Sequence, residues 1–191
     1  MSLVGELTYF LGLQIKQIED MIFISHSKYA KNIVKKFGLE NASHKRTPSA
    51  THLKLSKDKN GVVVDQSLYR SMIGSLLYLT TSIPDITFVV GVCARYQTEP
   101  KMSHLVQVKR ILKYINDTTD YGILYLHSDN SRLIGYCDAD WAGGADDRKN
   151  TSGGCFFLGN NLVSWFSKKQ NSLSLQQLKY NISLQEVAAL G

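Results

Sequence analysis

The stretch that decides the fold of this 191-residue chain reads Arg132-Leu-Ile-Gly-Tyr-Cys-Asp-Ala-Asp-Trp-Ala-Gly143. It has the pattern of a β-strand that ends in two aspartates and then turns. Burying a carboxylate is costly unless it is paired, hydrogen-bonded or bound to a metal ion. Asp138 and Asp140 therefore predict half of a Mg²⁺ site, since residues two apart share a face of a regular strand. The alternative is that Asp138 caps the turn before Trp141.

The last third of the chain has the two-residue period of strands. Four segments carry this pattern, with Gly159-Asn-Asn161 as a hairpin turn between the last two; they are residues 122–127, 132–138, 153–158 and 162–166. We expect these strands to form one antiparallel sheet.

Hairpin and helix patterns fill the first two thirds. Residues 7–24 predict a hairpin, and a helix capped by Ser27 follows to Phe37. A polar connection leads to three further helices at residues 67–80, 84–96 and 103–115. In the last helix, Lys109, Arg110 and Lys113 face away from the apolar stripe. The predicted fold class is thus α+β: an N-terminal hairpin and helix, a helical middle and a C-terminal antiparallel sheet.

Composition limits the class of protein. The chain has 43% apolar residues, enough for a buried core, and 22 Lys and Arg against 16 Asp and Glu, a net charge of +6. This basic excess favours a polyanionic partner. Three widely spaced cysteines predict reduced, buried thiols. Since no signal peptide or membrane-spanning run is present, we expect an intracellular protein, cytoplasmic or nuclear, with no membrane partner.

Several motifs together resemble the plant copia-type retrotransposon Pol polyprotein, across the end of its reverse transcriptase and the start of its RNase H. They occur in the family's order and cover most of the chain; they are Tyr9-Phe-Leu-Gly-Leu-Gln-Ile15, Tyr69-Arg-Ser-Met-Ile-Gly-Ser-Leu-Leu-Tyr78, Gly135-Tyr-Cys-Asp-Ala-Asp-Trp-Ala-Gly143, Thr151-Ser-Gly153 and Ser164-Trp165 through Ser167-Lys-Lys-Gln170. The resemblance implies four parts. They are the end of a palm-like hairpin and helix (1–40), a linker (41–66), a helical region like the thumb and connection (67–120), and a truncated RNase H-like sheet (121–191).

The resemblance also implies roles for individual residues. Asp138 would be the first catalytic aspartate of RNase H, with Asp140 as a second metal ligand. An RNA/DNA hybrid is the implied partner, because basic side chains grip a phosphate backbone without reading its sequence. The candidates for this grip are Lys109, Arg110, Lys113, Lys168 and Lys169. The remainder of a reverse transcriptase is the other implied partner.

Two departures from the family bear on activity. The paired aspartates of the polymerase site do not occur upstream of Leu7, and the family's Glu-containing helix after Leu175 is replaced by Gln176-Gln-Leu-Lys-Tyr-Asn-Ile-Ser183. Glu186 is the candidate to supply the second catalytic carboxylate. RNase H chemistry needs three or four carboxylates around two Mg²⁺ ions, so we expect weak or absent Mg²⁺ binding.

The leading hypothesis is therefore a catalytically inactive fragment of a copia-type polyprotein that binds RNA/DNA hybrid. One alternative is a Mg²⁺-dependent ribonuclease H that uses Asp138, Asp140 and Glu186. The other is a nucleic-acid or protein binding module without catalytic chemistry. The enzyme alternative requires the carboxylates to converge around a metal ion.

Overall fold

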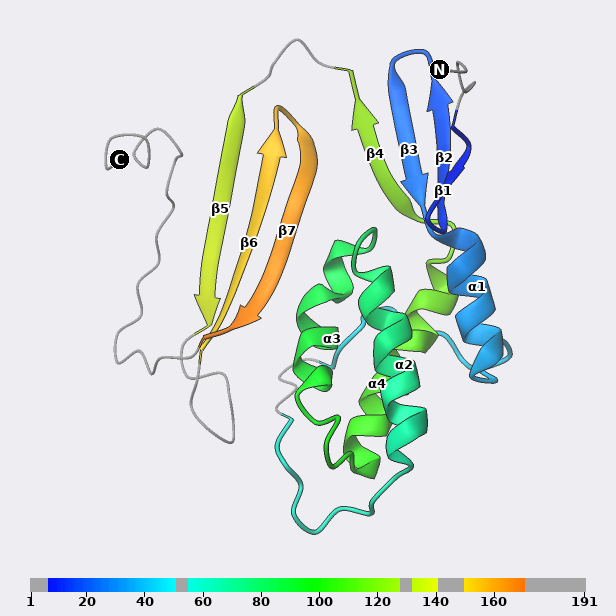
Figure 1. Cartoon of the computed structure of the whole chain (residues 1–191), viewed down its shortest axis with the longest axis vertical. Helices are drawn as coiled ribbons and strands as arrows, with labels where there is room; N and C mark the ends of the chain where they lie inside the picture. Colours follow the sequence, from blue (N-terminus) through cyan, green and yellow to red (C-terminus); the bar gives the residue numbers. More distant parts are fainter. Residues whose placement is uncertain (1–6, 51–54, 128–131, 141–149, 171–191) are drawn as a thin grey trace.

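The computed structural model describes residues 7–50, 55–127, 132–140 and 150–170, and in these ranges the chain has the α+β class that its sequence predicts. Helices form the body of the molecule, one antiparallel sheet lies beside them, and a second antiparallel sheet extends from one end of the helical body (Figure 1). The helices are α1 (Ser27–Lys36), α2 (Gln66–Leu79), the short 3₁₀ helix η1 (Pro84–Ile86), α3 (Thr87–Ala94) and α4 (Met102–Asp117). The strands are β1 (Tyr9–Phe10), β2 (Leu13–Ile18), β3 (Met21–Ser25), β4 (Gly122–Leu126), β5 (Leu133–Asp140), β6 (Thr151–Leu158) and β7 (Asn161–Lys169).

The predicted N-terminal hairpin is confirmed as β2 and β3, which pair from Ile18 opposite Met21. The short β1 is separated from β2 by Leu11 and Gly12, both at positive φ, where a turn reverses the chain. Helix α1 begins at Ser27 as expected, but Ser27 does not cap it. The side chain of Gln14 on β2 instead accepts a 2.8 Å hydrogen bond from the backbone N–H of Lys28. One N–H group of the first turn is thus satisfied from a neighbouring strand.

The core lies between the four helices. Helix α4 contacts α1, α2 and α3, and the helices bury a continuous apolar cluster. Its fully enclosed members include Met72, Ile73, Leu76, Ile86, Val90, Val108, Ile111, Leu112 and Ile115. These residues recur at helical spacing, and the apolar stripe predicted for the helix at residues 103–115 is confirmed. None of the helices in the described part of the chain combines the length and the apolar character that a membrane span requires.

The predicted four-stranded C-terminal sheet is wrong in its first strand. Strand β4 pairs with β3, with Ile24 opposite Ile123, and completes a sheet of order β1-β2-β3-β4. Strands β5, β6 and β7 form a separate sheet. The cause is helix packing: α1 follows β3 directly and α4 precedes β4 closely, and because α1 packs against α4, the two strands lie side by side. The division of the chain into four parts stays a prediction.

Strands β4 and β7 bring the two sheets together, and the side chain of Asn161 bonds one to the other. The Asn161 amide, at the start of β7, donates a 2.8 Å bond to the carbonyl of Leu126 and accepts another of 2.8 Å from its N–H. These two bonds satisfy the backbone N–H and carbonyl of Leu126 on β4, as a pairing strand would. This contact carries the β5–β7 sheet against the N-terminal sheet (Figure 1).

The polar segment predicted as a linker is held on the helices at several points. The Tyr96 hydroxyl donates to the Leu55 carbonyl at 2.9 Å, and His104 Nε2 lies 2.7 Å from the Ser56 carbonyl. Val63 forms an isolated antiparallel bridge with Lys101. In its described residues, the connection is thus a fixed surface layer.

A buried histidine joins the N-terminal sheet to the helical body. His26 is 2% exposed, and its Nδ1 lies 2.5 Å from the Ser82 hydroxyl. The rings of Tyr29 and Tyr78 pack beside it. Its Nε2 is buried and has no hydrogen-bond partner among the described residues. Burial lowers the pKa of His26 below its ordinary value, because a charged ring in this place loses its hydration.

This burial predicts an acid-sensitive fold. The folded chain favours neutral His26, whereas the unfolded chain binds a proton near pH 6.5, so the stabilisation is complete above pH 6.5 and decreases as pH falls toward the lower folded pKa. We expect Tm to fall between pH 7.5 and pH 5.5, and to fall less in a His26→Gln variant. Thermal melts at both pH values measure this difference. His127→Gln, at an exposed position after β4, is the control and should keep the wild-type pH dependence; equal slopes in all three proteins would contradict the prediction.

Candidate functional site

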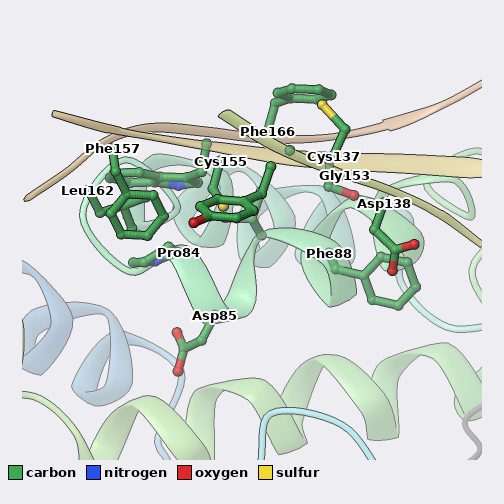
Figure 2. A pocket seen from close by; sticks show the side chains of 15 residues that line it. Pro84, Asp85, Phe88, Cys137, Asp138, Gly153, Cys155, Phe157, Leu162 and Phe166 are labelled. Carbon is green, nitrogen blue, oxygen red and sulfur yellow. The ribbon is translucent and has the colours of Figure 1, made fainter. Parts of the chain in front are cut away.

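Asp138 lies near the end of β5, as the sequence predicts. It is exposed and stands opposite Gly153 of β6, which in turn stands opposite Ser167 of β7. Figure 2 shows its carboxylate on the side of the strands that faces α3, near Phe88, whereas Cys137 and Phe166 lie on the other side. The strand assignment explains this alternation.

A cavity of about 740 Å³ lies between α3 and the β5–β7 sheet, and Asp138 is at its edge. Most of its lining is apolar or aromatic, including Phe88, Tyr136, Phe157, Leu162 and Trp165. Two hydrogen bonds hold the sheet over the helices. The Trp165 indole N–H donates to the Thr80 carbonyl, and Arg95 donates to the Thr151 hydroxyl, both at 2.8 Å. Trp165 is thus a packing residue; Trp141 lies outside the described residues.

The described side chains do not form a Mg²⁺ site at Asp138. Nowhere in the described residues do three His, Cys, Asp or Glu side chains come close enough to share a metal ion. Asp140 is described only by its backbone, which pairs with Thr151, and Glu186 lies outside the described residues. Asp85 also lines the cavity, but its carboxylate accepts a hydrogen bond from the Tyr114 hydroxyl of α4 and points away from the sheet (Figure 2). The roles of Asp138, Asp140 and Glu186 remain predictions.

The cysteines differ in exposure. Burial raises the pKa of the Cys93 thiol to about 12, which keeps it protonated and inert. Cys155 is half-buried in the cavity lining. The expectation of three buried thiols is wrong for Cys137, which is exposed because its strand position turns it away from α3.

The predicted basic residues of α4 come together on one surface. Lys109, Arg110 and Lys113 line a groove of about 470 Å³ that also includes Lys45. Their helical positions lie opposite the buried stripe of Val108, Ile111, Leu112 and Ile115. None of the described side chains lining the groove is acidic, although Ser103, at its margin, donates a hydrogen bond to Asp58. The groove therefore concentrates positive charge.

A strap formed by residues 45–50 builds the second wall of this groove. The Gln107 amide donates to the Pro48 carbonyl at 2.8 Å. Arg110 donates to the Thr47 hydroxyl at 2.9 Å and to its carbonyl at 3.3 Å. Sequence reasoning missed Lys45 as a site residue. The signal was the basic pair Lys45-Arg46 just before Pro48, but its place beside α4 depends on contacts about sixty residues apart.

The other two predicted basic residues lie elsewhere. Lys168 and Lys169 end β7, opposite Ser152 and Thr151 of β6. Lys168 is exposed and Lys169 is half-buried. The structure thus brings three of the five predicted basic residues into one groove and leaves these two on the sheet.

Comparison with known proteins gives a consistent set of relatives. The chain is 38% identical over 173 residues to the uncharacterized mitochondrial protein AtMg00810 of Arabidopsis thaliana, which covers 90% of this chain and 71% of that protein. It is 35% identical over 168 residues to the retrovirus-related Pol polyprotein from transposon RE1 of the same plant, covering 88% of this chain and 12% of the polyprotein. It is also 35% identical over 181 residues to the polyprotein from transposon TNT 1-94 of Nicotiana tabacum, covering 90% of this chain and 14% of that polyprotein. No family model matches the chain, and no solved structure matches it.

The fold and its surfaces define an α+β chain with a basic groove on a central helix. The relatives complete the identification. The chain belongs to the retrovirus-related Pol polyprotein family of plant copia-type transposons, and it spans about an eighth of the length of the polyproteins that it matches.

The bond from Gln107 to Pro48 should help to hold the strap on α4 and protect it from proteolysis. Replacing it in Gln107→Leu removes the donor to Pro48, and a lost neutral hydrogen bond of this kind costs about 1 kcal/mol. We expect faster trypsin cleavage after Lys45 and Arg46, followed by mass spectrometry, while Tm falls only by a few degrees. The control is Asn116→Leu, which removes a similar bond to the Glu40 carbonyl. Faster cleavage at these sites in the control, or none in Gln107→Leu, would show that the strap does not depend on this bond.

Proposed function

We propose that the chain is a catalytically silent part of a copia-type Pol polyprotein that binds RNA/DNA hybrid through the groove on α4. The observation that supports binding is the convergence of Lys45, Lys109, Arg110 and Lys113 on one groove. Contacts from Lys and Arg to phosphates are electrostatic and indifferent to base sequence, which suits a hybrid of any sequence.

The proposed lack of catalytic activity concerns the β5–β7 sheet. A metal held by one carboxylate keeps most of its water and binds weakly. Nowhere in the described ranges do three His, Cys, Asp or Glu side chains come together to hold Mg²⁺. The alternative of a Mg²⁺-dependent ribonuclease H needs Asp140 and Glu186 to converge on Asp138. The other alternative is a module that keeps the fold, has no catalytic chemistry and binds nucleic acid or protein; it agrees with our proposal where its partner is nucleic acid.

A second partner follows from the N-terminal sheet. Several large apolar side chains are exposed on one of its faces, as the strand register shows, among them Tyr9, Ile18, Leu124 and Leu126. Exposed apolar clusters of this kind mark interaction surfaces. We propose that they contact the remainder of a reverse transcriptase, because the related polyproteins are about eight times as long as their match to this chain. We also propose a cytoplasmic or nuclear location.

Binding should depend on salt and on the groove. The logarithm of the hybrid association constant falls linearly with the logarithm of the salt concentration, with a slope of roughly 0.9 per phosphate contact on a duplex. We expect Lys109→Gln and Lys113→Gln each to reduce this slope by about one and to weaken binding at low salt. Fluorescence anisotropy with a labelled hybrid at several salt concentrations measures both quantities.

The matched control is Lys16→Gln, which removes the same charge from an exposed position on β2. Its slope should equal that of the unchanged protein. If Lys16→Gln weakens binding as much as the groove variants do, net charge rather than the groove explains the affinity. Binding that does not vary with salt would contradict the proposed contact with phosphates.

If the β5–β7 sheet lacks a catalytic site, the chain does not cleave an RNA/DNA hybrid. We expect the purified chain to leave a labelled RNA/DNA hybrid intact in millimolar Mg²⁺, at concentrations where binding is saturated, as judged by gel electrophoresis. Asp138→Asn is the control, since it removes the carboxylate and keeps the size of the side chain. Mg²⁺-dependent cleavage that this substitution abolishes would overturn the silent reading and establish the ribonuclease alternative.

A further inference from the structure

Thr47 stands at the point where the strap meets the basic face of α4. It is exposed, and its hydroxyl donates a 2.7 Å bond to the Ser49 carbonyl while accepting one of 2.9 Å from the Arg110 guanidinium. The local sequence is Lys45-Arg46-Thr47-Pro48. Thr47 is therefore a reachable hydroxyl that has cations before it in sequence, a proline after it, and an arginine bound to it in space.

We propose that Thr47 is a phosphorylation site and that its phosphate docks on Arg110 and closes the groove to nucleic acid. This inference rests on the proposed hybrid binding for its consequence, but the modification and the docking stand on the geometry of Thr47. A threonine followed by proline, with basic residues before it, suits a proline-directed protein kinase. Ser49, two residues further on, is followed by Ala50 and lacks this pattern.

The transfer requires a nucleoside triphosphate, which the kinase supplies. The bond between the γ-phosphorus and the oxygen that bridges to the β-phosphate breaks, and a bond from Thr47 Oγ1 to that phosphorus forms. The hydroxyl proton passes to the base of the kinase, and the nucleoside diphosphate leaves. No oxidant or metal bound to this chain takes part.

The new phosphate would meet a partner that is already in place. It carries a charge of about −1.5 to −2 at pH 7 and three acceptor oxygens. The Arg110 guanidinium already points a donor at Thr47 Oγ1, and paired donors to phosphate are among the strongest hydrogen bonds in proteins. The ester oxygen loses its proton, so the bond to the Ser49 carbonyl is replaced by contacts with Arg110.

Docking would change the charge of the groove. Four cationic side chains line it, and a phosphate at its margin cancels roughly two of these charges. The phosphate also occupies the arginine best suited to grip a nucleic-acid backbone. We therefore expect the modified chain to bind hybrid about ten- to a hundredfold more weakly at 0.1 M salt, with a salt slope smaller by about two.

The experiment begins with the full chain, a purified proline-directed kinase and ATP. Mass spectrometry should place one phosphate on Thr47, with none added there in Thr47→Val and a phosphate retained in Thr47→Ser. A ³¹P NMR titration should show the second pKa of the phosphate below its usual value near 6, and Arg110→Gln should raise it again. Absence of the phosphate from Thr47, or a titration indifferent to Arg110, would overturn the proposal.

Hybrid binding then separates this proposal from the proposed function. Thr47→Glu should weaken binding, whereas Thr8→Glu, which adds the same charge at an exposed position before β1, should not. Thermal melts of both variants are the check that each one is folded. If the unmodified chain binds hybrid and the phosphorylated chain binds equally well, closure of the groove is refuted. If the unmodified chain does not bind at all, the proposed function fails, and the mass and ³¹P measurements still decide whether Thr47 is modified and docked.

Discussion

The burial of the apolar stripe of α4 is the interaction on which the rest of the structure depends. Leu105, Val108, Ile111, Leu112 and Ile115 enter the core, and α4 contacts each of the other three α-helices. Because a helix has a fixed period, the same packing turns the basic residues outward and sets the strap beside them. Packing of α4 against α1 also places β4 beside β3. One buried stripe therefore positions the core, the groove and the N-terminal sheet.

Local patterns predict the elements of this fold, because a helical stripe or a strand alternation depends only on residues that are close together in the sequence. The hairpin of β2 and β3 and the helices α1 to α4 follow from such patterns. The prediction that β4 belongs to the C-terminal sheet was wrong, because the strand that lies beside β4 depends on how two helices that are distant in sequence pack together. The capping of α1 by Gln14 likewise joins residues that are neighbours only in the folded chain.

The same division holds for the candidate sites. The basic face of α4 was predictable, since helical phase alone places Lys109, Arg110 and Lys113 opposite the core. Lys45 was not, because its position depends on the bond between Gln107 and Pro48. Asp138 was correctly placed on a strand, but a metal site needs carboxylates from separate elements to converge. No strand pattern specifies that convergence, and the described residues do not form it.

Binding and catalysis differ in how much change they tolerate. A groove that holds a phosphate backbone sums several independent charge contacts, so the loss of one cation weakens it gradually. A two-metal site loses its geometry, and its charge balance, when one or two carboxylates are replaced. A chain of this family that has changed its acidic residues while keeping the cations on α4 would therefore retain affinity long after turnover has ended. The proposed binding at the groove therefore tolerates substitution better than metal-dependent catalysis at the aspartate strand would.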